Sequence, residues 1–524
     1  MAAASPHTLD LSKALVTQAP ALADWLVIAP VVLCIVMGAA LLIIRKRADI
    51  QAGIAIAGLV ALVALDSALL VHVAETGPVT MTMGRWLPPF GISFTADLLG
   101  AMLALASSFA ALACGINGIV DIDDSGKRYG FYPFLFLMMA GVSGSFLTGD
   151  IFNLYVWFEV LLISSFGLLV LGSERGQIDG ATKYAFLNLV ATTLFLIATA
   201  YLYGIFGTLN MADIVEKART TPGAPLMTLA SLYFLAFGMK AAAFPVNFWL
   251  PASYHTPRVV ASALFAGVLT KVGVYALMRT LVMLLPAERA ELSLLIGIVA
   301  VLTMAVGVFG ALAQSDLRRL LGYLVISGIG VILSGVSLAS REALAGAIVY
   351  MMHSMIVMTA LYIASGIAAR AAGRNLSIAT LAGFYRSNPF LSALTLLLFF
   401  SVSGLPPFSG LWPKAMLVKA SFDAGQGWLG AMVLLTGFLT MVAVVRVWAL
   451  AYWRPHGEVA DEQMPERTAP AFATCYLPLL LLTALTVGFG LFPDVLIRAA
   501  QTAAQGLLDP SAYIHSVFPM GGAR

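Results

Sequence analysis

The chain has 524 residues, of which 60% are hydrophobic and only 10% are charged. This balance excludes a string of soluble domains and indicates a membrane protein that crosses the bilayer many times. The net charge of +3 is small and the basic residues are scattered over short polar segments, which excludes a nucleic-acid-binding surface.

Apolar runs between polar segments predict fourteen transmembrane helices, because crossing a hydrocarbon core of about 30 Å requires roughly 20 apolar residues with satisfied backbone groups. The first twenty residues do not resemble a cleavable signal peptide, so we expect the first helix to be retained. Three isolated cysteines, at 34, 114 and 475, are interpreted as core residues. In chain order the predicted spans are 24–44, 52–73, 93–120, 130–148, 151–172, 180–206, 225–250, 261–284, 292–313, 318–338, 343–368, 389–420, 427–452 and 470–492.

The basic residues predict the orientation of these spans. If the odd-numbered helices run inward, fourteen Lys and Arg residues fall in cytoplasmic loops and eight in outer segments. The positive-inside rule then places both termini outside. Only residues 207–224 and 453–469 form sizeable polar linkers, and no nucleotide-binding or paired metal-ligand motif occurs. We therefore expect a transporter rather than an enzyme, with no cofactor and no metal site.

Two segments share a pattern of prolines. "AAAFPVNFWLP" and "LPPFSGLWP" each place a tryptophan just before a proline that follows an earlier proline by six residues. Proline removes a backbone N–H and clashes with the preceding turn, so helix seven should break at Pro245 and helix twelve at Pro406 and Pro407. Matching broken helices five spans apart are typical of inverted-repeat transporters, which place ion sites at the breaks.

The predicted fold is therefore an all-α polytopic membrane protein with two inverted five-helix repeats, formed by helices 4–8 and 9–13. Its expected divisions are 1–129 for helices 1–3, 130–290 for the first repeat, 291–452 for the second repeat, and 453–524 for a linker, helix 14 and a C-terminal tail.

Ionisable side chains deep within the predicted spans are candidates for function, since each costs about 2.5–3.5 kcal/mol to insert at the bilayer centre. Burial and the carbonyl groups freed at a helix break can bring a lysine close to the point where it both accepts and releases a proton. These side chains belong to Glu159, Lys240, Lys271, His353 and Lys414.

A structural role is the alternative for each candidate. Glu159 could anchor helix packing, but no apolar contact requires a carboxylate there. Lys240 and Lys271 could extend toward an interface, although both lie about two turns or more from either helix end. His353 is as consistent with a hydrogen-bonded core histidine as with a proton relay. Lys183 lies near the start of its span and is interpreted as interfacial, while Asp66 and Asp97 are left unassigned.

Three stretches carry a specific resemblance to a known family. They are "DIFNLYVWFEVLLISSFGLLVLG", "FGMKAAAFPVNFWLPASYHTPRVVASALFAGVLTKVGVYALMR" and "FSVSGLPPFSGLWPKAMLVKA". They resemble the antiporter-like subunits of respiratory complex I, membrane-bound hydrogenases and multisubunit Mrp cation/proton antiporters, over roughly residues 93–452. Within this group the chain is most similar to the D subunits of Mrp antiporters.

The resemblance implies a role for each candidate. Glu159 would pair with Lys240 on broken helix seven, Lys271 would be the central lysine of helix eight, and Lys414 would be the terminal lysine of broken helix twelve. His353 matches a bridging histidine of helix eleven, and His255 matches a histidine near the cytoplasmic mouth, although a loop histidine is often merely solvated. Gly328 departs from a histidine found in some complex I relatives, which argues against a relay on helix ten.

The expected function is proton movement along this mid-membrane line of Glu, Lys and His residues, coupled to export of sodium or another monovalent cation. The expected partners are the other membrane subunits of a hetero-oligomeric antiporter, protons, the cation and the lipid bilayer, in a bacterial inner membrane. Three alternatives remain: a proton-pumping subunit of complex I or a hydrogenase, a transporter of organic solutes, and a scaffold whose charges hold helices together.

Overall fold

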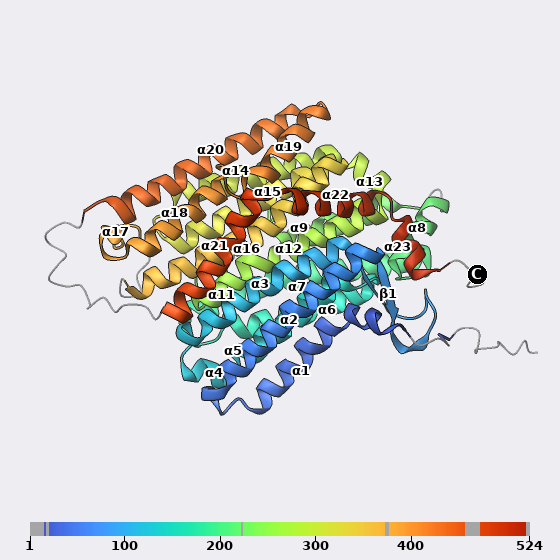
Figure 1. Cartoon of the computed structure of the whole chain (residues 1–524). Helices are drawn as coiled ribbons and strands as arrows, with labels where there is room; N and C mark the ends of the chain where they lie inside the picture. The colour runs from blue at the N-terminus through green and yellow to red at the C-terminus, as the bar shows by residue number, and fades with distance from the viewer. Residues whose placement is uncertain (1–14, 17–19, 222–223, 372–376, 456–471, 520–524) are drawn as a thin grey trace, which may run out of the picture.

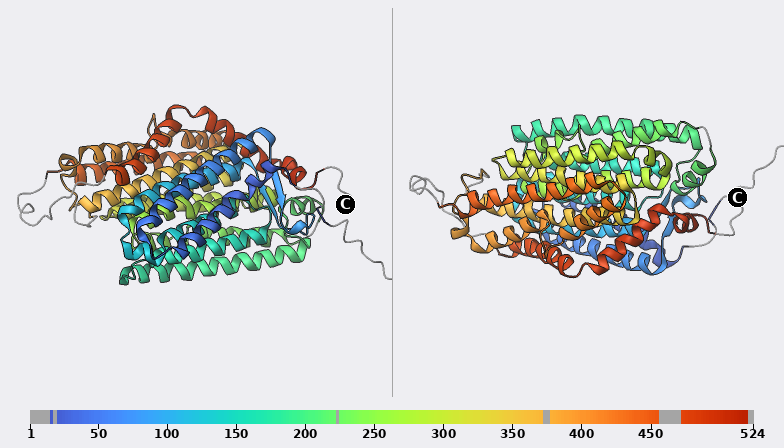
Figure 2. Two further views of the ribbon diagram at one scale, coloured as in Figure 1. Left: turned by 60° about the horizontal axis from the view of Figure 1, so that its bottom comes forward. Right: turned by 90° about the horizontal axis from the view of Figure 1, so that it is seen from above.

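The structure is a computed structural model that describes residues 15–16, 20–221, 224–371, 377–455 and 472–519. It is mostly helical, and the long helices run side by side in one elongated bundle (Figures 1 and 2). Strand β1 and helices α8 and α23 lie at one end of this bundle, which we call the β end, and α4 and α17 lie toward the other (Figure 1).

The N-terminal half of the described chain contains the following elements: a 3₁₀ helix at Leu22–Val27, α1 (Ala29–Ile43), α2 (Ala48–Thr76), β1 (Val79–Thr82), a 3₁₀ turn at Met83–Arg85, β2 (Ser93–Ala96), α3 (Leu98–Asp121), α4 (Asp124–Tyr129), α5 (Phe131–Leu147), α6 (Ile151–Leu169), α7 (Arg175–Phe206), α8 (Met211–Thr220), α9 (Leu226–Ala241), α10 (Trp249–Ser253), α11 (Val259–Leu264), a π-helical segment at Phe265–Leu269, α12 (Thr270–Leu277) and a second π-helical segment at Met278–Leu284.

The C-terminal half contains α13 (Pro286–Glu291), α14 (Ser293–Ala313), α15 (Leu317–Leu338), α16 (Arg341–Ala371), α17 (Phe384–Ser387), α18 (Pro389–Ser403), α19 (Leu411–Asp423), α20 (Gly427–Val447), π-helical segments at Trp448–Trp453 and Phe472–Tyr476, α21 (Leu477–Leu491), α22 (Asp494–Leu508) and α23 (Ser511–Val517).

Ten helices of the described chain are long and apolar enough to cross a membrane, which makes the protein a multi-pass membrane protein. Four shorter apolar helices, α1, α5, α9 and α18, lie in other predicted spans. The count of fourteen crossings depends on including these four and stays a prediction. Helix α16 is buried along its whole apolar length and lies inside the bundle.

The start of the third predicted span is wrong. Residues 93–96 form strand β2, which pairs antiparallel with β1, and helix α3 begins only at Leu98. The reason is local, because the Asp97 side chain accepts a hydrogen bond from the Gly100 amide at 2.9 Å and so caps the helix there. The predicted polar linker 207–224 likewise contains the helix α8.

The predicted helix breaks at Pro245, Pro406 and Pro407 are present. Helix α9 ends at Ala241 and α10 begins at Trp249, while α18 ends at Ser403 and α19 begins at Leu411. The three prolines lie within these two non-helical segments, since a proline inside a helix removes one of its hydrogen bonds.

Both ends of the described chain lie at the β end of the bundle. Leu15 forms an isolated β-bridge with Trp86, and the Ser516 hydroxyl of α23 lies 2.9 Å from the Thr80 hydroxyl of β1. The described part of the chain therefore starts and finishes on one side, which agrees with an even number of crossings between these points.

Candidate functional site

The Glu159 carboxylate lies in α6, near the middle of the helix. Its Oε1 atom is buried and has no hydrogen-bond partner among the described residues. A buried carboxylate oxygen without a hydrogen-bond donor is energetically costly, so its presence calls for an explanation. The carboxylate is close enough to Lys240 to interact with it electrostatically.

Lys240 lies at the end of α9, one residue before the last residue of that helix. Only 5% of the residue is exposed, and its Nζ donates a hydrogen bond of 2.7 Å to the Thr192 hydroxyl of α7. The ammonium group also lies 4.9 Å from the centre of the Phe158 ring. The expected direct ion pair with Glu159 is not formed, and the Lys240 ammonium group is hydrogen-bonded to Thr192 instead.

Lys271 is fully buried near the middle of the helical segment Val259–Leu284. Its Nζ donates a hydrogen bond of 2.6 Å to the Ala266 carbonyl, in the π-helical segment just before α12. Such π-helical turns are frequent at functional sites. Gly273 lets this helix approach the broken helix closely, because a Cβ atom there would lie 2.9 Å from the Ala241 nitrogen.

Lys414 and His353 both have their hydrogen-bond partners at or next to the second helix break. Lys414 is 8% exposed. Its Nζ donates to the carbonyls of Val402 and Ser403, in the last turn of α18, at 3.0 and 2.8 Å. His353 of α16 has its Nδ1 2.8 Å from the Ser409 hydroxyl within the break. Its Nε2 is buried and has no hydrogen-bond partner among the described residues.

The bundle thus buries four of the predicted residues: Lys240, Lys271, His353 and Lys414. Glu159 is half-buried and lies near Lys240. His353 is close enough to interact electrostatically with both Lys271 and Lys414, and Lys240 with Glu159. Among the residues that the structure describes, none of the seven ion pairs involves Lys240, Lys271 or Lys414. Each lysine instead donates to a neutral oxygen.

Sequence reasoning missed Thr192, the hydrogen-bond partner of Lys240. A threonine on a mostly apolar helix is common, and its usual partner is a carbonyl of its own helix. The neighbouring Thr193 follows this habit and donates to the Leu189 carbonyl at 2.9 Å. Only packing of α7 against α9 distinguishes the two threonines.

Gly328 of α15 lies against Tyr350 of α16. A Cβ atom there would lie 3.1 Å from the Tyr350 ring. The Tyr350 ring is tilted against the His353 ring, with 5.5 Å between the ring centres. A larger side chain at this position would therefore press on the tyrosine beside the histidine.

His255 lies apart from the buried lysines, in the loop after α10. Its Nε2 is 3.0 Å from the Arg319 guanidinium, and its Nδ1 is 2.9 Å from the Pro251 carbonyl. Since the guanidinium can only donate, Nε2 accepts and Nδ1 donates, which defines the neutral tautomer. Burial, and then the charge of Arg319, lower the pKa of His255 below its ordinary value of 6.5.

This lowered pKa predicts a loss of stability in acid. The unfolded chain binds a proton at His255 at higher pH than the folded chain does, so stability rises with pH in that range. The contribution is complete above the ordinary pKa of 6.5 and is lost as the pH falls below it. We expect the melting temperature of the purified complex to fall less between pH 7.5 and 5.5 in His255→Gln than in the wild type. His515→Gln, an exposed histidine of α23, is the matched control, and an equal fall in all three proteins would contradict the prediction.

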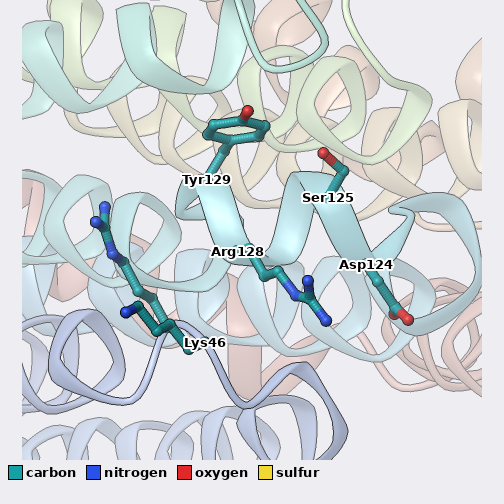
Figure 3. A pocket seen from close by; sticks show the side chains of 6 residues that line it. Lys46, Asp124, Ser125, Arg128 and Tyr129 are labelled. Atoms are coloured by element: carbon teal, nitrogen blue, oxygen red, sulfur yellow. The ribbon is translucent and has the colours of Figure 1, made fainter.

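A surface hollow of about 430 Å³ lies elsewhere, between the α1–α2 loop and α4 (Figure 3). Its lining is basic and shares no residue with the buried lysine sites: Arg45, Lys46, Asp124, Ser125, Arg128 and Tyr129. Over the described residues, no group of three or more His, Cys, Asp or Glu side chains is arranged to hold a metal ion.

Comparison with protein families identifies a match over residues 148–440 to the model described as NADH:quinone oxidoreductase/Mrp antiporter, transmembrane. The D subunit of the Na⁺/H⁺ antiporter of Alkalihalophilus pseudofirmus is 36% identical over 493 residues, which cover 94% of this chain and 99% of that protein. The corresponding protein of Bacillus subtilis is 35% identical over 86% of this chain and 91% of that protein.

Solved structures with the same fold include a chain of the Mrp complex from Dietzia sp. The TM-score is 0.88 with 26% identity, covering 95% of this chain and all of that chain. A chain of respiratory complex I from Thermus thermophilus has a TM-score of 0.79 with 24% identity, covering 93% and 99% of the two chains. The match to complex I concerns the fold alone.

Proposed function

Because this chain belongs to the family of D subunits of Mrp-type Na⁺/H⁺ antiporters, which is related to the membrane subunits of complex I, we propose that it moves protons for a multisubunit cation/proton antiporter. Its proposed partners are the other membrane subunits of such a complex, and the exchanged cation is sodium or another monovalent cation. The proposed location is a bacterial inner membrane, with both termini outside.

The observation that carries this proposal is the set of contacts made by the buried lysines. Lys240, Lys271 and Lys414 donate to a hydroxyl or to carbonyl groups rather than to carboxylates. A buried lysine in an ion pair would leave an uncompensated carboxylate when it loses its proton. A lysine on neutral oxygens loses its proton without that cost, and its amine still has N–H groups to donate. These three sites are therefore suited to take up and release protons.

The proposed path runs from Lys240 and Lys271 to His353 and Lys414. His353 supplies the link between the two halves, since it interacts electrostatically with both Lys271 and Lys414. The free Nε2 of His353 can accept a proton, while Ser409 holds Nδ1. His255 is proposed to lie at the mouth of this path, at the end of the bundle opposite the β end.

We propose that Glu159 and Thr192 are alternative partners of Lys240. The structure has the lysine on Thr192, with the Glu159 carboxylate nearby and without a donor at Oε1. Movement of the ammonium group to Glu159 would form an ion pair and favour the charged lysine. A neighbouring subunit that biases this choice would couple proton uptake to cation movement.

Two inverted repeats, 130–290 and 291–452, are part of the proposal. In both stretches an apolar helix, α9 or α18, is interrupted by a proline-containing break and followed by a helix with tryptophan in its first two residues, α10 or α19. A lysine lies within a few residues of each break, as expected where freed carbonyls form an ion site.

The experiment that tests the function is sodium-dependent proton exchange in inverted vesicles that contain the whole subunit set. Wild type is compared with Glu159→Ala and Lys414→Ala at equal amounts of assembled protein. Loss of exchange in both variants would support the relay. Retained exchange in both would contradict it and favour a scaffold. The complex I type of pump would keep the relay residues, but the relatives named as antiporter subunits favour the antiporter.

Replacing Thr192 with valine should slow sodium-driven proton exchange by roughly fivefold, because a hydrogen bond of this kind contributes about 1 kcal/mol. Valine preserves the shape and removes the acceptor of Lys240. Thr193→Val is the matched control, since that residue is exposed and its hydroxyl donates to the Leu189 carbonyl of its own helix. Equal rates in the two variants would show that Thr192 does not hold Lys240 during exchange.

A further inference from the structure

The basic surface hollow of Figure 3 plays no part in the proposed proton path. Its volume of about 430 Å³ falls within the range of about 300–1,000 Å³ that is typical of ligand sites. The hollow is therefore large enough for a small molecule or a lipid headgroup. Two elements supply its lining, the α1–α2 loop with Arg45 and Lys46, and α4 with Asp124, Ser125, Arg128 and Tyr129.

Positive charge dominates the lining of the hollow. Arg45, Lys46 and Arg128 are exposed, and none of them forms an ion pair within the part of the chain that the structure describes. The one carboxylate of the lining, that of Asp124, lies 3.3 Å from the Lys127 Nζ and is compensated by it. Guanidinium and ammonium groups that line one hollow without carboxylate partners are suited to bind a phosphate group.

The hollow lies where apolar helices end. The α1–α2 loop joins two apolar helices, and α5 begins at Phe131, two residues after Tyr129. The residues that flank the loop are apolar and exposed, with Ile43 at 84% and Ile50 also on the surface. Tyr129 is exposed as well, and tyrosine is enriched at the border between the bilayer core and water. The hollow therefore opens at the membrane surface.

Exposed apolar side chains continue from the hollow along both helices of the α1–α2 hairpin. Those on α1 and α2 include Val32, Val36, Leu42, Val60 and Val71. In a membrane protein, exposed apolar surface of this kind contacts acyl chains. A phospholipid matches both features at once, since its phosphate fits the basic hollow and its chains fit the apolar helices. A soluble phosphate or an acidic protein loop would match the hollow alone.

We infer that this hollow binds the phosphate headgroup of an anionic phospholipid whose acyl chains lie against α1 and α2. Arg45, Lys46 and Arg128 hold the phosphate. With both termini outside, as proposed above, the hollow faces the cytoplasm, because it lies away from the β end, and the cytoplasmic surface of the membrane is negative. The lipid site shares no residue with the proposed proton path, so either can fail without the other.

The test is the rate at which a maleimide modifies a thiol introduced into the hollow of the assembled complex by Ser125→Cys. The complex is placed in lipid discs of phosphatidylglycerol or of phosphatidylcholine, and modification of this chain is followed by mass spectrometry. The three native cysteines are buried, so they add no fast-reacting thiol. A bound headgroup covers the introduced thiol, so modification should be about fivefold or more slower in phosphatidylglycerol, the factor that one basic residue contributes at an anionic surface.

Matched variants separate the hollow from the general charge of the membrane. Ser387→Cys is the control thiol, since Ser387 is exposed on α17, which also lies away from the β end, and its rate should be the same in both kinds of disc. Adding Lys46→Gln and Arg128→Gln to Ser125→Cys should abolish the difference between the discs. Adding Arg386→Gln, which removes an exposed charge of α17, should leave that difference in place.

Three results would overturn the lipid site. Equal rates for the thiol of Ser125→Cys in both kinds of disc would do so, and equally slow rates would indicate that a neighbouring subunit covers the hollow. Slowing of the control thiol by the same factor would show an effect of the negative surface alone. Inorganic phosphate added to phosphatidylcholine discs should not slow the reaction, and slowing as strong as that by phosphatidylglycerol would indicate a site for a free anion.

Discussion

Lys414→Met should reduce sodium-driven proton exchange by about 10²-fold or more, the loss typical of removing a positioned proton-transfer group. Methionine fills a similar volume but cannot carry a proton, and it leaves the carbonyls of Val402 and Ser403 without their donor. Each buried acceptor without a donor costs about 1–3 kcal/mol, so exchange must be compared at equal amounts of assembled complex.

Two further substitutions separate proton transfer from charge and from surface effects. Lys414→Arg keeps the positive charge but does not release a proton, so it should be as inactive as Lys414→Met. Lys419→Met is the matched control on the same helix, because its side chain is 68% exposed and forms a surface ion pair with Asp423. Wild-type exchange in Lys414→Met would remove this lysine from the relay, and exchange in Lys414→Arg alone would indicate that only its charge matters.

Glu159→Gln should lower exchange by about 10- to 100-fold. Glutamine is neutral, so it cannot form the proposed ion pair that favours the charged form of Lys240. The shape of the side chain is nearly unchanged, which limits the effect on assembly. Glu75→Gln, an exposed residue near the end of α2, is the matched control for loss of a carboxylate.

The coupling between Glu159 and Lys240 can be measured directly. If they act as a pair, the double variant Glu159→Gln with Lys240→Met should lose little more exchange than either single variant, as expected for residues that function together. Fully additive losses would indicate that the two side chains act independently. The structure gives the starting point for this comparison, since it has Lys240 on Thr192 rather than on Glu159.

The sequence alone was sufficient to predict where the helices break and which lysine side chains are buried. Proline cannot continue a helix without losing a hydrogen bond, so Pro245, Pro406 and Pro407 predict interruptions wherever the rest of the chain folds. The burial of Lys240, Lys271 and Lys414 follows from the long apolar runs around them, which must lie in the bilayer. These are local consequences of residue type.

The sequence was less reliable at helix ends and in short polar segments. The apolar run that begins at residue 93 predicts the start of a helix, yet Asp97 caps α3 and the preceding residues pair as a strand with β1. The helix α8 lies in a segment whose polar composition is typical of a linker, so the composition did not predict it. In both cases the secondary structure depends on one capping side chain or one packed helix face. The average composition of a segment does not reveal such a single residue or face.

What the sequence by itself determined is therefore the membrane class, the broken helices, the family and the buried ionisable residues. Only the tertiary structure decided which atoms those residues meet: Thr192 rather than Glu159 for Lys240, the Ala266 carbonyl for Lys271, and Asp97 for Arg279. The physical reason is range. Helix formation and membrane burial depend on neighbouring residues, whereas a hydrogen bond of about 3 Å between distant helices depends on their packing and on side-chain conformation.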